Sequence, residues 1–290
     1  MKNLCFALCG ITLLCMFSFC SVEETEFEET AKETEREEIS SGDTPSAGEP
    51  EHFPPDEDDE VQADNTPKLP PVYKDPNAPV LQINELRTEY NSGQARAEFI
   101  EFRANAVVNL DGMRVFIASN NRNPLVYEFS SVEIGEYEYV VLHLRTLDAS
   151  SKDEYGENLN ESGGRDASPT ARDFWVPGNT KLLRKTDIVY VLDRDDNVVD
   201  AVMIAEKPEQ EWPRDYFTET AAFLFNQGAW KSAEGTFPVP ADAVDSSGIK
   251  TSLTRSISRD ETTAFTRTAA DWYITAIGGV TPGMRNSPRP

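Results

Sequence analysis

Cysteine is absent from most of this chain of 290 residues. The four cysteines all lie at the start of the chain, at Cys5, Cys9, Cys15 and Cys20. The rest of the chain therefore contains neither a disulfide nor a site that binds metal through thiolates. Histidine is almost as scarce, because His52 and His143 are the only two. A histidine-dependent hydrolase would have to use one of these residues or replace imidazole with carboxylates.

Sequence motifs for common cofactors are also missing. The chain has no P-loop, no Gly-x-Gly-x-x-Gly and no ligand spacing typical of zinc. Its formal net charge is −24, which is opposite to the basic surface that nucleic-acid binding requires. We therefore expect no cofactor, no metal, no catalytic residues and no specific nucleic-acid site. A glycosidase-like carboxylate pair stays open, because sequence spacing does not reveal a pair that meets only in space.

The first 20 residues have the pattern of an export signal. Lys2 is followed by an apolar run from Leu4 to Phe19, which is shorter than the roughly 20 apolar residues of a transmembrane helix. Cys20 stands where the acidic sequence begins, and a cysteine at that junction resembles a bacterial lipoprotein box. We predict that residues 1–20 are a lipoprotein signal peptide and that acylated Cys20 anchors the protein in the lipid bilayer. A simple cleaved signal and an uncleaved anchor are the alternatives.

Residues 21–79 are acidic and poor in apolar side chains. They contain 19 Asp or Glu against 4 Lys or Arg, and the part from Pro45 onward is rich in proline. Such a segment buries too little apolar surface to offset its ordering entropy, so we predict a disordered stalk. We favour a tether that holds the domain away from the membrane. A docking tail for a basic partner is the alternative.

Residues 80–290 contain short runs in which apolar and polar side chains alternate, separated by turn signals such as Asn91-Ser92-Gly93 and Asp111-Gly112. Alternation of this kind predicts strands with two unlike faces, and hence an antiparallel sheet. The expected strands are 83–86, 97–103, 113–117, 125–129, 137–144, 182–192 and 198–204, with more between Lys250 and Ile277. Seven or more such strands predict a sandwich. Trp272 should be buried, since it shares a strand face with Ile274.

Two long excursions interrupt the strands. Residues 148–173 are polar, and a loop of this length is functional or mobile. Residues 206–248 carry seven aromatic side chains, with Pro213 as a start signal for a short helix and Gly228 as its stop. We expect the second excursion to pack on the sandwich as a lid. An exposed binding surface is the alternative.

Three candidate sites have ordinary structural explanations. The turn Asp193-Arg194-Asp195-Asp196-Asn197 lacks the Gly and Glu of an EF-hand, because Val198 and Ile204 occupy those positions. We interpret it as a hairpin turn, with a weak calcium site as the alternative. His143 has no nucleophile or metal-binding pattern beside it, which indicates a surface or packing role. Residues 248–290 have a local net charge of +3, which indicates a charge-balanced surface or else a polyanion contact.

Several segments together resemble a known family. The segments are Ile83-Asn84-Glu85, Glu98-Phe99-Ile100-Glu101-Phe102, Asn109-Leu110-Asp111-Gly112-Met113, 135–142, 185–193, 199–202, 252–255, Ala270-Asp271-Trp272 and Thr281-Pro282-Gly283-Met284-Arg285-Asn286. In this order they resemble the lamin-tail domain, although Met113 stands where that family often has an aromatic residue. The resemblance implies an immunoglobulin-like antiparallel β-sandwich over residues 80–290. It also implies an exported or cell-surface protein of bacterial type.

The sequence therefore predicts an all-β protein with long inserted loops that is held in the cell envelope, at the periplasmic face or the cell surface. We expect its sandwich to be a non-catalytic binding or structural module for a protein or a polyanionic envelope ligand. The alternative is a hydrolase, or an accessory subunit of one, with a carboxylate-lined cleft between sandwich and lid.

Overall fold

The computed structural model of the protein describes residues 71–88, 98–250 and 254–290. The predictions for Cys20, for the signal peptide and for the stalk up to residue 70 lie outside the described residues, as does the turn at Asn91-Ser92-Gly93. The description below concerns the compact unit that ends at Pro290.

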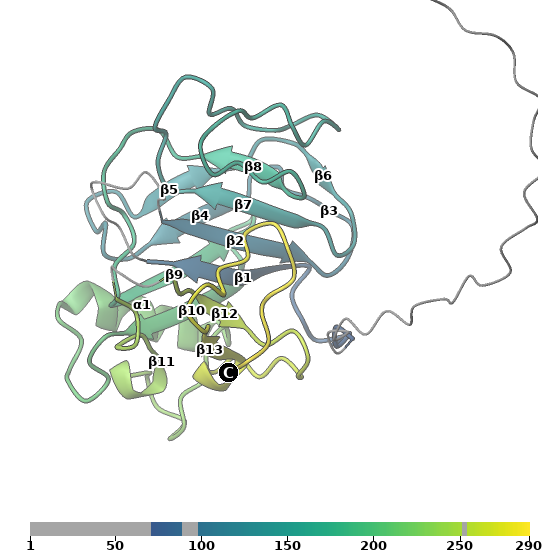
Figure 1. The fold of residues 1–290 in the computed structure, drawn as a ribbon. Coiled ribbons are helices and arrows are strands. Elements are labelled where there is room, and N and C mark those ends of the chain that lie inside the picture. Colours follow the sequence, from purple (N-terminus) through teal and green to yellow (C-terminus); the bar gives the residue numbers. More distant parts are fainter. Residues whose placement is uncertain (1–70, 89–97, 251–253) are drawn as a thin grey trace, which may run out of the picture. The chain divides into compact units, whose positions relative to one another are not determined.

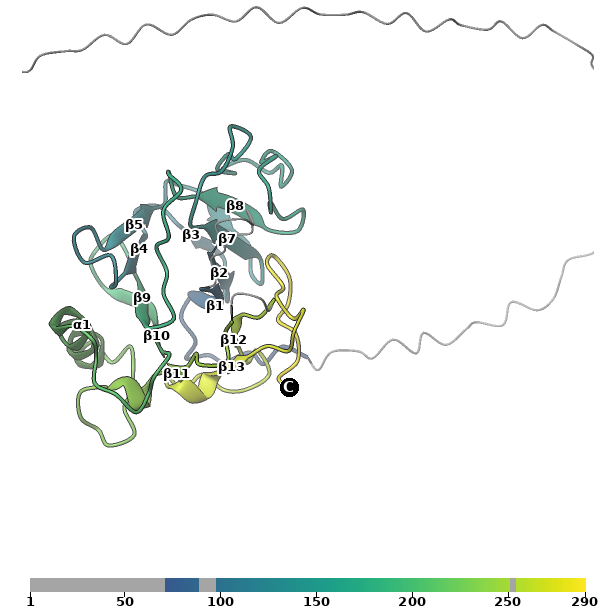
Figure 2. The same cartoon turned by 60° about the vertical axis from the view of Figure 1, so that its left-hand side comes forward.

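Two β-sheets form the sandwich that the alternating pattern predicts. Across the larger sheet lie β13 (Trp272–Ile274), β12 (Ile257–Arg259), β1 (Leu81–Arg87), β2 (Phe99–Ala104), β7 (Tyr139–His143) and β8 (Arg172–Trp175). Across the smaller sheet lie β11 (Val244–Asp245), β10 (Val198–Ala205), β9 (Asp187–Leu192), β4 (Arg114–Ile117) and β5 (Leu125–Glu128). Figure 2 shows the two sheets as separate layers that face each other. The fold is therefore an all-β sandwich.

The core lies between the sheets and takes alternate side chains from each strand. On β1, Leu81 and Ile83 follow the two-residue period, and a β-bulge between Ile83 and Glu85 returns Leu86 to the core. Ile100 and Phe102 of β2 join the same cluster. The opposite face of the larger sheet is polar but also buried, because the C-terminal segment covers it. This second buried face positions most of the charged groups discussed below.

The remaining elements lie around the sandwich. β3 (Val108–Asn109) and β6 (Glu133–Ile134) form a separate two-stranded sheet. The helix α1 (Asp215–Asn226) lies beside β9 and β10 (Figures 1 and 2). The short 3-10 helices are η1 (Pro240–Asp242) and η2 (Ala269–Asp271). Among the residues described, no helix has the length and hydropathy to span a bilayer.

The sheets are not purely antiparallel, which corrects the sequence prediction. β8 runs parallel to β7, and β11 runs parallel to β10. β8 begins at Arg172, within the predicted polar excursion 148–173, and ends at Trp175, just after it. The excursion therefore ends in a strand. The strand expected over 182–192 begins later, at Asp187. Parallel neighbours need long connections, and the two excursions of the sequence supply them.

The contacts of the sandwich begin before the predicted boundary at Val80. The Tyr73 amide donates to the Glu261 carbonyl at 2.7 Å. The Asp75 carboxylate accepts a hydrogen bond of 2.7 Å from the Phe265 amide. Residues 73–75 therefore belong to the folded unit rather than to the stalk. The sequence gives no apolar signal there, because both contacts are made through the backbone or a carboxylate.

Candidate functional site

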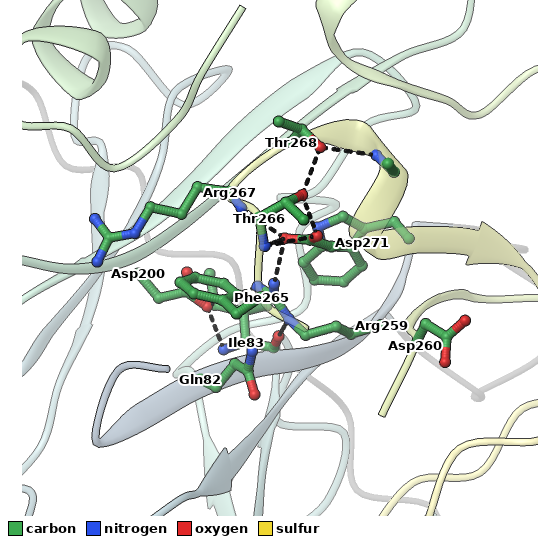
Figure 3. Close-up of polar contacts among 12 residues, drawn as sticks. Gln82, Ile83, Asp200, Arg259, Asp260, Phe265, Thr266, Arg267, Thr268 and Asp271 are labelled. Atoms are coloured by element: carbon green, nitrogen blue, oxygen red, sulfur yellow. Dashed lines mark hydrogen bonds and ion pairs between the residues drawn. The ribbon is translucent and has the colours of Figure 1, made fainter. Parts of the chain in front are cut away.

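Arg259 of β12 is the centre of a buried polar cluster that joins the two sheets (Figure 3). Its Nε donates to the Ile83 carbonyl of β1 at 2.8 Å, and its Nη2 donates to Asp200 of β10 at 2.8 Å. The same Asp200 oxygen accepts the Ile83 amide at 2.9 Å. Arg259 and Asp200 therefore tie a strand of each sheet together through one buried ion pair.

The far side of the Arg259 guanidinium contacts Asp271, whose carboxylate lies 3.4 Å away. Asp271 also accepts hydrogen bonds from Thr266 and from the Arg267 amide, as Figure 3 shows. The Trp272 ring lies 4.2 Å from the guanidinium, which adds a cation–π contact. The adjoining cavity has a volume of only about 20 Å³, which leaves room for a water molecule and little more. This cluster is structural.

Two carboxylates of the larger sheet hold the C-terminal segment, residues 278–290, against its outer face. Glu85 of β1 accepts from the Thr281 amide at 3.1 Å and from the Thr281 hydroxyl at 3.3 Å. Glu101 of β2 accepts from the Gly283 amide at 2.6 Å. Val280 packs on a small apolar cluster around Phe99 on the same face. These contacts bury both carboxylates completely.

A third carboxylate, Glu261, completes this attachment. One of its oxygens accepts from Arg103 and from the Tyr139 hydroxyl, each at 3.0 Å. The other accepts from the Asn286 amide at 3.1 Å. The Asn286 side chain then donates to the Arg259 carbonyl at 2.9 Å. The segment is therefore fixed at Thr281, Gly283 and Asn286 by hydrogen bonds to buried carboxylates.

Burial changes the acidity of these groups. Desolvation raises the pKa of Glu85 to about 7, against the hydrogen bonds from Ser256 and Thr281 that favour its ionised form. Desolvation, with the nearby Glu85 charge as a smaller cause, raises the pKa of Glu101 well above its usual range. Perturbed carboxylates often mark active sites, but structural networks perturb them too. Here every described partner belongs to the fold, which indicates a structural role.

His143 lies on the outer face of β7, where it forms a hydrogen bond with Asp173 and packs on Trp175. Its Nε2 is 2.8 Å from Asp173 of β8, and its ring stacks on Trp175 at 3.9 Å. The ring borders a cavity of about 300 Å³ together with Phe99 and Pro282. Among the described residues that line this cavity, none is a serine or a cysteine, and Thr254 is the one with a hydroxyl group. The arrangement agrees with the packing role expected from the sequence.

The turn at residues 193–197 connects β9 and β10, as the hairpin interpretation predicts. The Asp193 carboxylate accepts from the amides of Asp195 and Asn197, each at 2.9 Å, and from the Asn197 side chain. Asp196 accepts from Arg114 at 2.6 Å. Within the described ranges, no cluster of three or more His, Cys, Asp or Glu side chains is able to hold a metal ion.

Three of the six basic residues of 248–290 form ion pairs. Arg259 pairs with Asp200 and Asp271, Arg285 lies 3.6 Å from Glu261, and Arg289 lies 3.2 Å from Asp260. This pattern fits the charge-balanced surface that the sequence suggested.

The aromatic excursion packs on the sandwich, as expected for a lid. Pro213 precedes α1, and Gly228 follows its end with a positive φ of 66°. Trp230 is 1% exposed, and Phe217 is also buried in the main core cluster. Phe223 and Phe237 remain exposed at the edge. Most of the aromatic side chains therefore serve the core.

The cleft beside this lid differs from the carboxylate-lined cleft of the hydrolase hypothesis. Its volume is about 770 Å³, and it lies between the loop before β9 and the start of α1. Its charged lining consists of Lys181, Arg184, Lys185, Arg214 and Glu206. Cations therefore outnumber carboxylates by four to one. We call these residues and the space between them the basic cleft.

The sequence analysis identified the segments that hold the C-terminal segment, but it did not predict the hydrogen bonds between them. Glu85, Glu101 and Gly283 belong to the family resemblance, whereas Glu261 enters the sequence analysis only through the local net charge of residues 248–290. The basic cleft was missed, although Lys181, Arg184 and Lys185 are close together in the sequence. The signal that could have found it is a run of three cations in a strongly acidic chain.

Comparison with known proteins places the chain in a family without giving its function. No curated protein matches the chain. Residues 79–274 match a family model described as a protein second domain. The match covers both sheets and α1, and that family is one of unknown function. The matched residues make up more than half of the chain, so the chain belongs to this protein second domain family.

Proposed function

We propose that this protein is a membrane-anchored envelope lipoprotein whose β-sandwich is a non-catalytic binding or structural module. One observation carries the proposal for the sandwich: the buried carboxylates are engaged in holding the fold. Glu85 and Glu101 bind the C-terminal segment, and Asp200 binds Arg259 between the sheets. A hydrolase would instead aim paired carboxylates into an accessible cleft.

The lamin-tail resemblance supports the choice of a sandwich module. Its motif residues are far apart in the sequence but meet at one place, where Glu85 and Glu101 accept from Thr281 and Gly283. The proposed anchor rests on the sequence alone, through the apolar run that ends at Cys20. We propose that the lipid on Cys20 holds the sandwich at the periplasmic face or the cell surface. There it would bind an envelope protein or ligand.

Lipid labelling of Cys20 tests the anchor. The full chain, Cys20→Ala and Cys15→Ala are produced in a bacterial host with a labelled fatty acid. We expect the full chain and Cys15→Ala to carry label and to remain with the membrane. We expect Cys20→Ala to lose the label and to leave the membrane fraction on washing. Cys15→Ala is the matched control because Cys15 lies inside the apolar run. Unchanged labelling of Cys20→Ala would remove the basis of the anchor.

A further inference from the structure

The loop that carries most of the basic cleft is held rigidly by buried groups. The Leu182 amide donates to Glu98 at 3.1 Å, and the Arg184 amide donates to Asp187 at 3.0 Å. Leu183 between them is completely buried. These contacts fix the backbone from 182 to 184 while the side chains of the flanking cations remain outside.

Three further hydrogen bonds continue this attachment. Ser246 donates its hydroxyl to the Lys185 carbonyl at 2.5 Å, and Ser119 donates to the Leu182 carbonyl at 3.2 Å. The Thr186 hydroxyl accepts from the Glu206 amide at 3.1 Å. The Ser119 and Thr186 hydroxyl groups of the cleft are thus used by the fold. The cations are the positively charged groups that line the cleft.

The cations differ in their partners. Lys185 lies 3.3 Å from Glu206 and forms an ion pair with it. Among the described residues, no carboxylate forms an ion pair with Lys181, Arg184 or Arg214. Lys181, Arg184 and Arg214 are exposed. Lys181 does act on the buried Glu98 carboxylate through its charge. In a chain with a net charge of −24, a group of three cations outside any ion pair is conspicuous, since acidic side chains are abundant.

The start of α1 adds a second source of positive potential. Arg214 is the N-cap residue, and no side chain caps this end of the helix by a hydrogen bond. Amide groups in the first turn of a helix lack intrahelical acceptors, and the helix dipole favours an anion near them. Asp215 in the first turn is the one acidic side chain there and is exposed. The helix end therefore supplements the cations.

From this arrangement we propose that the basic cleft binds a phosphate-bearing ligand through Lys181, Arg184 and Arg214. Arginine and lysine on separate elements suit a compact anion with several oxygens. The volume of about 770 Å³ lies in the range of small-molecule sites. The phosphate could belong to an anionic lipid headgroup or to a free phosphorylated compound. The proposal rests on the proposed role as a binding module.

The test compares two triple variants of the full chain that change the net charge equally. The first variant is Lys181→Glu, Arg184→Glu and Arg214→Glu. The matched control is Arg122→Glu, Lys152→Glu and Lys231→Glu, because these three cations are exposed and lie outside the cleft. Any effect of the overall charge is then the same in both. The thermal melting of both variants is measured first.

Binding is measured with two probes that separate the sources of phosphate. The first is short-chain inorganic polyphosphate, titrated by calorimetry at low ionic strength. The second is vesicles of phosphatidylcholine with or without phosphatidylglycerol, followed by co-sedimentation. We expect the cleft variant to lose about tenfold or more in affinity for at least one probe, as the loss of charge-assisted hydrogen bonds implies. The control should bind like the natural sequence. Vesicle binding alone would identify a lipid headgroup as the source.

Two results overturn the proposal. One is that the natural sequence binds neither probe. The other is that the two triple variants lose binding affinity equally. If the cleft variant fails to fold, Arg214→Glu and Arg122→Glu form the single-residue comparison with the same criteria. Lipid labelling at Cys20 is independent of the cleft. If phosphate binding fails and Cys20 is labelled, the cleft proposal is wrong and the proposed anchor is retained. If Cys20 is not labelled and phosphate binds, the anchor is wrong and the cleft proposal is retained.

Discussion

Gly283 offers the sharpest test of how the C-terminal segment is held. Its φ is +76°, and a Cβ at this position would lie 2.0 Å from the Ser168 hydroxyl and 3.0 Å from Cβ of Ala171. Its amide donates to Glu101 at 2.6 Å, and its carbonyl accepts from Thr170 at 2.7 Å. Gly283→Ala must therefore displace the segment from the sheet.

The expected loss can be worked out from these contacts. A left-handed backbone costs an alanine roughly 1 kcal/mol, and the lost hydrogen bond to a buried carboxylate costs roughly 1.5–3 kcal/mol. Gly283→Ala should thus lose about 3 kcal/mol or more of unfolding free energy. Gly278→Ala is the matched control, because Gly278 has a φ of +83° but no atom within 4 Å of an added Cβ. It should lose roughly 1 kcal/mol at most, since alanine also restricts the unfolded chain.

The stability of both variants is measured by thermal melting and by urea unfolding. For a domain of this size, a loss of about 3 kcal/mol corresponds to a fall of about 10 °C in Tm. Gly278→Ala should fall by about 3 °C or less. Equal melting temperatures for the two variants would refute the reasoning, because backbone strain alone would then explain both.

Three further predictions concern stability. Trp272→Ala should lower the free energy of unfolding by roughly 3–5 kcal/mol, because the residue is 4% exposed. Trp272→Phe should lower it clearly less, as measured by urea unfolding. Equal losses in the two variants would contradict the packing argument. Burial raises the pKa of Glu85 from 4.5 to about 7, so between these pH values the folded form binds more protons than the unfolded form. The free energy of unfolding should therefore fall as pH rises from 4.5 to 7, and Glu85→Gln should flatten this slope. An unchanged slope in Glu85→Gln would contradict the assignment to Glu85. A chain that begins at Val80 should melt below one that begins at Pro71, because it lacks the contacts of residues 73–75; identical melting would restore the later boundary.

The strands of the sandwich could be predicted because their side chains alternate. Phe99–Ala104 and Val198–Ala205 both form strands, although nearly every position in them is buried in the fold. β8 could not be predicted in this way, because Arg172–Trp175 is short and follows a long polar loop. Its parallel partner is Val140–His143, which is about 30 residues earlier, so no turn signal marks the pair.

The buried carboxylates show a limit of the alternating pattern. Glu85 and Glu101 stand at positions that the pattern assigns to solvent, and they do lie on the outer face of the sheet. They are buried because the C-terminal segment, almost 200 residues later, returns to cover them. A pattern read along one strand contains no information about what covers its far face. The order of the family resemblance suggested the link, but only the structure supplies the contact.

The distribution of charge shows why net composition is a poor guide to the site. The carboxylates of Glu98 and Asp187 face inward, where each accepts a backbone amide of the loop before β9. By holding that backbone, they leave the neighbouring cations Lys181 and Arg184 exposed toward α1. Acidic residues thus build a site of opposite charge, because a buried carboxylate acts as a hydrogen-bond acceptor for the fold rather than as surface charge. A net charge of −24 argues against a polyanion spread over the whole surface, and it leaves a local anion site fully compatible with the fold.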